Sequence, residues 1–154
     1  MLIFKTLHIL AMIAMVTIEI GSESLYAVAI ARRDVRALAT VHRLLEQVRA
    51  GPASIAAFVS GVVFGLLTAA TGGFDFLDGW LIAAYVLVAV FLVTTTIFLR
   101  GVLPLGRAAV EAEAGQRPAE EVVRRMASHP ALLLFALDVG VVVAFVLYLV
   151  LKPF

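Results

Sequence analysis

Four long apolar stretches limit what this chain can fold into more than any other feature of the sequence. They cover about residues 2–21, 53–71, 80–99 and 131–151. A helix needs roughly 20 residues to cross a hydrocarbon layer about 30 Å thick. The runs are continuously apolar and do not alternate with polar residues, which favours helices over the strands of a barrel. We therefore predict an all-α fold, a four-helix transmembrane bundle that forms a single domain over residues 1–154.

The composition excludes an ordinary water-soluble domain. Hydrophobic residues make up 63% of the chain and charged residues 15%, against about 45–50% and about 25% in soluble proteins. The lipid bilayer is therefore the expected partner, and the net charge of +1 gives no general basic field for nucleic acid. The absence of cysteine excludes thiolate metal sites and a cysteine nucleophile. Lys5 and His8 interrupt the first stretch, which we interpret as a span and not as a cleaved signal.

The arginines are confined to two of the three loops between the stretches. They are Arg32, Arg33, Arg36, Arg43 and Arg49 in the first loop and Arg100, Arg107, Arg117, Arg124 and Arg125 in the third. The second loop, residues 72–79, carries Asp75 and Asp78 and no base. Cytoplasmic loops of membrane proteins are enriched in arginine and lysine. We therefore predict a multi-pass protein of the bacterial cytoplasmic (inner) membrane with both termini outside, N-out/C-out.

Both arginine-rich loops have helical patterns. The pattern of the first span continues to Ala31, and the apolar residues from Val35 to Val48 recur at helical spacing between arginines. Pro118, with Glu120 and Glu121 after it, is typical of the first turn of a helix. We expect amphipathic cytoplasmic helices that extend the spans or lie along the membrane surface. A dedicated lipid or protein docking site is the alternative.

Small residues recur every four positions in two of the spans. The second span contains Ala57, Gly61 and Gly65, and the fourth contains Ala136 and Gly140. Because helices in lipid gain little from hydrophobic burial, such stripes are typical of helix–helix contacts. We expect both stripes to pack inside this bundle, with contact between two copies of the chain as the alternative. The hydroxyls of Thr94, Thr95 and Thr96 are expected to bond to carbonyls of their own helix.

Three acids lie within or at the ends of the predicted spans. Glu19 and Glu23 are one turn apart in the first span, and Asp138 is in the fourth. Ionisable groups are costly in a membrane, so each is a candidate functional group. Glu19 and Asp138 both fall in the predicted cytoplasmic half, where they could share a proton or flank a cation. The alternative has Glu23 at the membrane surface and the other two acids satisfied by hydroxyls, water or arginines.

His8, Met12 and Met15 share a helical face with Glu19. Histidine and methionine both serve as axial ligands of haem, so this face is the candidate site for haem b. A second histidine within the spans is absent, because His42 lies in the first loop and His129 at the start of the fourth span. The alternative for His8 is a hydrogen-bonded histidine near the membrane surface.

Two terminal motifs resemble a known family. Lys5-Thr-Leu-His8-Ile-Leu-Ala11 resembles the opening K-x-L-H-I/V-L-A of a bacterial family of predicted integral membrane proteins of unknown function, of the DUF 2269 type, and the apolar run ending in Lys152-Pro153 resembles its closing segment. That family is distantly similar to the copper-resistance D proteins and to HemJ-type protoporphyrinogen oxidases. The resemblance implies a role for His8 toward haem or a metal, and for Lys152 as the closing base.

Three functions are consistent with these observations. The first is a small inner-membrane component of uncharacterised role, more in keeping with a non-enzymatic protein than with an enzyme, that acts alone, as a homo-oligomer or with a membrane partner subunit. The second is a haem- or copper-associated redox protein that uses His8. The third is a proton or cation pathway through Glu19 and Asp138. The P-loop, G-x-S-x-G and H-E-x-x-H motifs of soluble enzymes are absent from the sequence.

Overall fold

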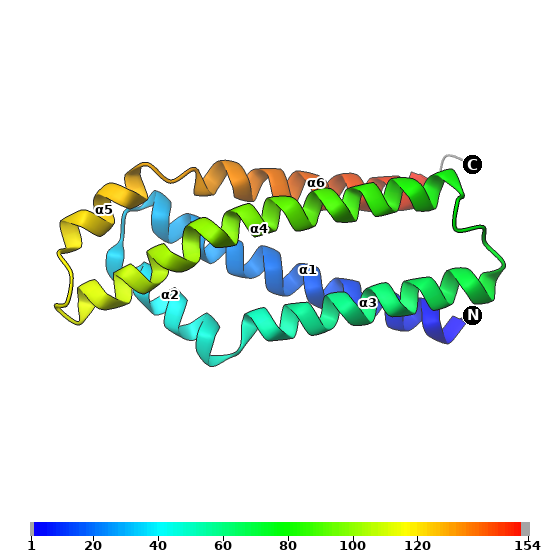
Figure 1. The fold of residues 1–154 in the computed structure, drawn as a ribbon, viewed down its shortest axis with the longest axis horizontal. Coiled ribbons are helices and arrows are strands. Elements are labelled where there is room, and N and C mark those ends of the chain that lie inside the picture. Colours follow the sequence, from blue (N-terminus) through cyan, green and yellow to red (C-terminus); the bar gives the residue numbers. More distant parts are fainter. Residues whose placement is uncertain (1, 152–154) are drawn as a thin grey trace.

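The computed structural model describes residues 2–151, with side chains through residue 148. Within that range the chain is built from helices without strands. They are α1 (Leu2–Ala31), α2 (Val35–Gln47), α3 (Ala50–Gly72), α4 (Gly79–Glu113), α5 (Ala119–Ala127) and α6 (Ala131–Leu151). Four long helices run side by side along the long axis, and α2 and α5 lie together at the end of the molecule opposite the two termini (Figure 1).

The four long helices match the four predicted spans. In the described chain, α1, α3, α4 and α6 are long and apolar enough to cross a membrane, which confirms the predicted all-helical bundle. Two of them are longer than a bilayer requires. At 1.5 Å per residue, the 30 residues of α1 and the 35 residues of α4 measure about 45 and about 52 Å. Both helices are therefore longer than the hydrocarbon layer, and both end where α2 and α5 lie.

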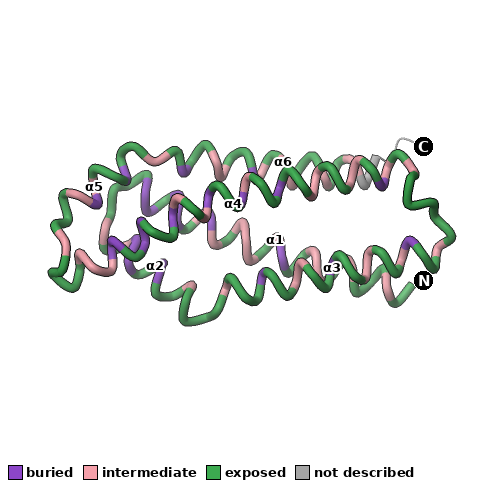
Figure 2. Tube along the Cα trace, in the orientation of Figure 1, coloured by how far each residue is buried: buried purple, intermediate pink, exposed green. Residues whose placement is uncertain are grey.

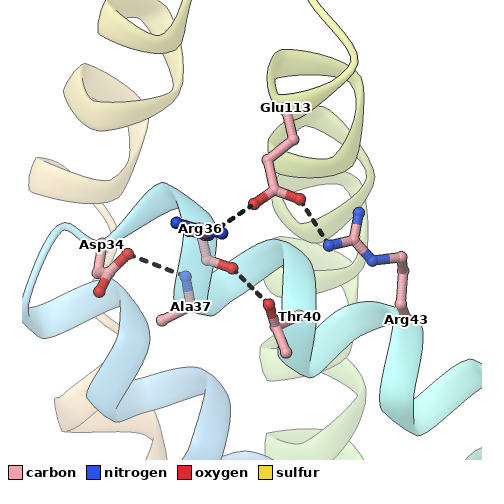
Figure 3. Close-up of polar contacts among 6 residues, drawn as sticks. All are labelled: Asp34, Arg36, Ala37, Thr40, Arg43 and Glu113. Carbon is pink, nitrogen blue, oxygen red and sulfur yellow. Dashed lines mark hydrogen bonds and ion pairs between the residues drawn. The ribbon is translucent and has the colours of Figure 1, made fainter.

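The connection from α1 to α2 is tight and hydrogen-bonded. Arg33 adopts the left-handed conformation, with φ 53°, and the Asp34 N–H donates to the carbonyl of Ala29 at 3.1 Å, which closes α1 in the manner usually reserved for glycine. The Asp34 carboxylate then accepts a hydrogen bond from the Ala37 N–H at 2.9 Å (Figure 3). One acidic residue thus ends one helix and caps the next.

An ion-pair group fastens α2 to the end of α4. Glu113 lies 2.5 Å from the guanidinium of Arg43 and 4.0 Å from that of Arg36, so that one carboxylate bridges two turns of α2 (Figure 3). Both α2 and α5 are amphipathic, as the arginine-rich loops predict, with Leu38 and Val122 among their fully buried residues. We refer to α2, α5 and the adjoining residues 26–31 of α1 and 98–113 of α4 as the cap.

The main apolar core lies in the cap and not along the spans. Its members come from α1, α2, α4, α5 and the first residue of α6 and include Tyr26, Leu38, Phe98, Leu105 and Met126. Buried positions accordingly gather where α2 meets α1 and α4 (Figure 2). Along the spans, large apolar side chains stay exposed on the outside of the bundle. This distribution is expected where the outside solvent is lipid at the spans and water at the cap.

Glycines let α1 approach α3 closely. The position of a Cβ on Gly61 would lie 2.7 Å from the Met12 sulfur, and one on Gly65 would lie 2.9 Å from the His8 ring. On α6 the stripe behaves differently. Ala136 and Gly140 are exposed, and a Cβ on Gly140 would meet no atom within 4 Å. In the described chain, therefore, the α3 stripe faces α1, whereas the α6 stripe faces no other helix.

Candidate intramembrane acid site

Two acids from different helices are fully buried in the bundle. Glu23 on α1 and Asp138 on α6 each have 0% of their surface exposed. The charged groups that face Glu23 in the described chain are Asp138 and, more weakly, Glu19, so that the surroundings of this carboxyl are acidic. Neither oxygen of Glu23 receives a hydrogen bond from the described residues. Glu23 and Asp138 can hydrogen-bond to each other only if one of them carries a proton, because two ionised carboxylates have no donor between them.

Threonines of α4 supply donors to Asp138. The Thr94 hydroxyl donates to one carboxyl oxygen, and the Thr95 hydroxyl lies 3.5 Å from the other. The Thr94 hydroxyl is also 3.1 Å from the carbonyl oxygens of Val90 and Phe91, so a small rotation can move its hydrogen bond between its own helix and Asp138. The expectation that the three threonines bond to their own helix holds for Thr94 and for Thr96, which donates to Leu92. The Thr95 hydroxyl instead faces Asp138.

Glu19 has a partner of its own. The Ser54 hydroxyl of α3 donates to its carboxylate, and Ser54 is 3% exposed. The sequence predicts Glu19 as the neighbour of Asp138, whereas the structure brings Glu23 against Asp138 and leaves Glu19, one turn earlier on α1, with Ser54 of α3. The depth of Glu23 in the bilayer stays a prediction, whereas its side chain is fully enclosed in the bundle, with Asp138 of α6 beside it.

The face with His8, Met12 and Met15 packs against neighbouring helices. The His8 Nδ1 atom lies 2.7 Å from the carbonyl oxygen of Gly61, the Met12 sulfur lies over Gly61, and Met15 is 3% exposed. The hydrogen-bonded alternative for His8 is thus consistent with the geometry. The hydrogen bond engages one ring nitrogen and leaves Nε2 as the atom that could bind a metal.

The other two histidines lie far from His8, at the cap. His42 is 2% exposed and lies within α2, between α1 and α4, and His129 packs against Gly101 just before α6. Among the described residues, groups of three or more histidine, aspartate or glutamate side chains with the spacing of a metal site do not occur. Lys152, the second residue that the resemblance singles out, lies outside the described residues.

Sequence reasoning missed several members of this region. The sequence pattern does not single out Ser54 or Tyr26, and it indicates only that His42 lies in the first loop. A signal for His42 exists in the sequence, since it lies four residues after Leu38 on the apolar face of α2 and would be expected to point inward. Nothing comparable marks Ser54, which the sequence shows only as one small polar residue at the start of a span.

Comparisons with known proteins agree with this architecture. Searches among curated proteins and solved structures yielded no match. A family model described as a predicted integral membrane protein (DUF2269) matches residues 2–153, almost the entire chain. The four apolar helices of this chain agree with that description. The chain belongs to the DUF2269 family of predicted integral membrane proteins, whose function is unknown.

Proposed function

We propose that this protein takes up and releases a proton within the membrane, on the carboxyl pair formed by Glu23 and Asp138. The observation that carries the proposal is the complete burial of both acids beside each other, with a third acid, Glu19, as the other charged group that acts on Glu23 in the described chain. Isolated carboxylates are strongly disfavoured in a low-dielectric interior. Two ionised carboxylates side by side are disfavoured further by their mutual repulsion, which one proton shared between them removes.

The hydrogen bonds indicate how the pair divides the charge. Thr94 and Thr95 place hydroxyl donors at Asp138, and donors stabilise the ionised form of a carboxyl group. Glu23 has no donor among the described residues and is more stable as the protonated acid, which can donate to Asp138. A proton can thus reside on Glu23. It leaves more readily when the Thr94 hydroxyl turns away from its own helix and donates to Asp138, because that bond stabilises the ionised form.

Infrared spectroscopy of the purified protein tests whether the pair holds this proton. At neutral pH the wild-type protein should show the C=O stretch of a protonated carboxylic acid, and Glu23→Gln should remove it. Glu120→Gln, at an exposed position of α5, is the matched control and should leave the band in place. A wild-type spectrum without the band at neutral pH would show that both acids are ionised, which contradicts the proposal.

Proton flux tests whether the site exchanges its proton across the membrane. In liposomes that contain the protein and a pH-sensitive dye, an imposed potential should change the pH of the interior. The interior should acidify or alkalinise according to the sign of the potential. Glu23→Gln and Asp138→Asn should each slow this flux by at least about tenfold, since a positioned proton-transferring group typically contributes that much or more. Unchanged flux in both variants would remove the pathway.

The predicted orientation belongs to the same proposal, because it decides on which side the proton enters. The chain has no natural cysteine, so single cysteines can report on each side of the membrane. In intact cells a membrane-impermeant maleimide should label Leu77→Cys in the acidic loop and leave Glu120→Cys unlabelled until the cells are opened. The reverse result would overturn the N-out/C-out arrangement in the bacterial cytoplasmic membrane.

Haem binding at His8 is the second candidate function. It is favoured by the bond between His8 Nδ1 and the Gly61 carbonyl, since a metal-binding histidine commonly uses its other ring nitrogen in this way. Met12, one turn further along α1, is the nearest sulfur ligand that the face offers. An absorption spectrum of the purified protein should then show a Soret band that His8→Ala removes. Colourless protein with the same spectrum in both forms would reject this function.

A further inference from the structure

A buried histidine in the cap lies between a surface acid and a buried tyrosine. The Nδ1 atom of His42 lies 2.7 Å from the hydroxyl of Tyr26 on α1, and its Nε2 atom lies 3.4 Å from a carboxyl oxygen of Glu46 on α2. The side chain of His42 is 2% exposed and that of Glu46 is 62% exposed. The three groups therefore form a line from solvent to the interior of the cap.

The inner end of this line lies on α1, close in the chain to one member of the acid pair. Tyr26 is 3% exposed and lies three residues after Glu23 on α1. Residues three apart share a helix face, with Cβ atoms about 5–6 Å from each other. The side chains of a helix lean toward its N-terminus, which is the direction of Glu23 from Tyr26. Both groups face inward, and Glu23 still lacks a donor.

The surroundings of His42 keep it neutral and able to relay a proton. Burial lowers the pKa of its imidazole, with Arg107 on α4 adding to this effect and Glu46 opposing it. Tyr26 is the group that faces it from α1. The backbone of Gly106 on α4 leaves room for the ring, since a Cβ there would lie 2.6 Å from Nδ1. The Nε2 atom has no hydrogen-bond partner among the described residues, which leaves it open to accept a proton.

We infer that Glu46, His42 and Tyr26 form the route by which protons reach the Glu23–Asp138 pair from the cap side of the membrane, a role that rests on the proposed function. In one transfer, Nε2 of His42 accepts a proton from the carboxyl group of Glu46. The Nδ1 proton passes to the Tyr26 oxygen as the Tyr26 hydroxyl proton leaves, through internal water, for the Glu23–Asp138 pair. Tyr26 ends neutral and one proton has moved from Glu46 to the pair, while His42 ends in its other tautomer and returns to the first one before the next transfer.

Hydrogen–deuterium exchange of the protonated-carboxyl band tests this route apart from the site itself. Transfer into heavy water shifts the band as the proton on the pair is replaced, and the rate of the shift reports access. Tyr26→Phe, which removes only the hydroxyl, and His42→Phe should each slow the shift by at least about tenfold. The band itself should keep its intensity, because Glu23 and Asp138 are unchanged in both variants.

His129→Phe is the matched control, because His129 is also a histidine at the cap end with a buried, unpartnered ring nitrogen. It should leave the exchange rate unchanged. Exchange as fast in Tyr26→Phe as in wild type would overturn the route and leave the acid pair in place. A wild-type spectrum without the band would instead overturn the proposed function. Tyr26→Phe keeps the ring in the core, so its result stands even if His42→Phe does not fold.

Discussion

The cap and the spans of this protein are held together by different forces. In the cap, apolar side chains from five helices bury one another, and Leu38, Phe98 and Val122 are completely enclosed. Along the spans, α1 meets α3 over glycines, and α4 meets α6 through threonine hydroxyls on Asp138. The chain therefore uses hydrophobic burial where the outside is water and close packing with hydrogen bonds where the outside is lipid.

The difference between the cap and the spans also explains which partners their polar side chains have. In the cap a polar side chain can reach water, as Glu46 does. In the spans a polar group must find a partner inside the bundle, and Glu19, Thr94 and Asp138 do so across helix boundaries. Glu23 is the exception among the described acids of the spans, since its oxygens have no donor among the described residues and the charged groups that act on it there are other acids. Such an arrangement lowers stability, and proteins keep arrangements of this kind mainly at functional sites.

Truncation of the cap core should have the largest effect. Leu38→Ala removes a fully enclosed side chain of α2 and should lower the free energy of unfolding by about 2–5 kcal/mol. Leu44→Ala in the same helix, where the side chain is 47% exposed, should change it by less than about 0.5 kcal/mol. Denaturant titration in detergent, followed by circular dichroism, measures both. Equal losses would show that the cap is not held by its core.

A bulky residue on the α3 stripe should come next. Gly65→Val pushes a side chain against the ring of His8 and should destabilise the bundle by about 1–3 kcal/mol. Gly140→Val on α6 is the control, since space there is open, and its effect should stay near zero. The same denaturant titration applies. If Gly140→Val were the more damaging change, α6 would have to contact something other than the helices of its own chain, such as a second copy.

Loss of the Asp34 cap should cost about 1 kcal/mol. Asp34→Ala removes the carboxylate that accepts from the Ala37 N–H at the start of α2, and N-cap losses are typically of this size. Asp78→Ala provides the comparison, because Asp78 precedes α4 without a side-chain cap bond and should change little. Thermal unfolding midpoints resolve the two variants. Matching midpoints for Asp34→Ala and wild type would argue against the capping role.

The pH dependence of the cap should be the smallest effect. Burial lowers the pKa of His42 and of His129, so below the ordinary histidine pKa of about 6.5 the unfolded chain binds protons that the folded chain refuses. Stability should therefore fall as the pH drops from about 7.5 to about 5.5, by less than the roughly 1 kcal/mol expected for Asp34→Ala. His42→Gln should flatten the dependence in part, with His129 supplying the remainder. A wild-type midpoint that rises on acidification would contradict the sign.

Much of the fold follows from the sequence because lipid imposes simple rules. Twenty apolar residues define a span, and the arginines separate the two loops of the cap from the acidic loop. The choice between Glu19 and Glu23 as the neighbour of Asp138 could not be made in this way. The two acids occupy one face of α1, one turn apart, and only the packing of α1 against both α3 and α6 separates them. A pattern along one helix cannot show which of two neighbours a residue faces.

The contact between α1 and α3 has a further consequence. His8 lies over Gly65, Met12 over Gly61 and Glu19 beside Ser54, so steps of four and then seven residues along one helix are matched by equal steps along the other. After a slide of one turn, either Met12 would meet Ala57 or His8 would meet Ala69, and the Cβ of an alanine would crowd it where a glycine now leaves room. Ser54 does not repeat either: after such a slide Glu19 would meet Ala50 or Phe58, neither of which has a side-chain donor. Two glycines and one serine thus select the same register.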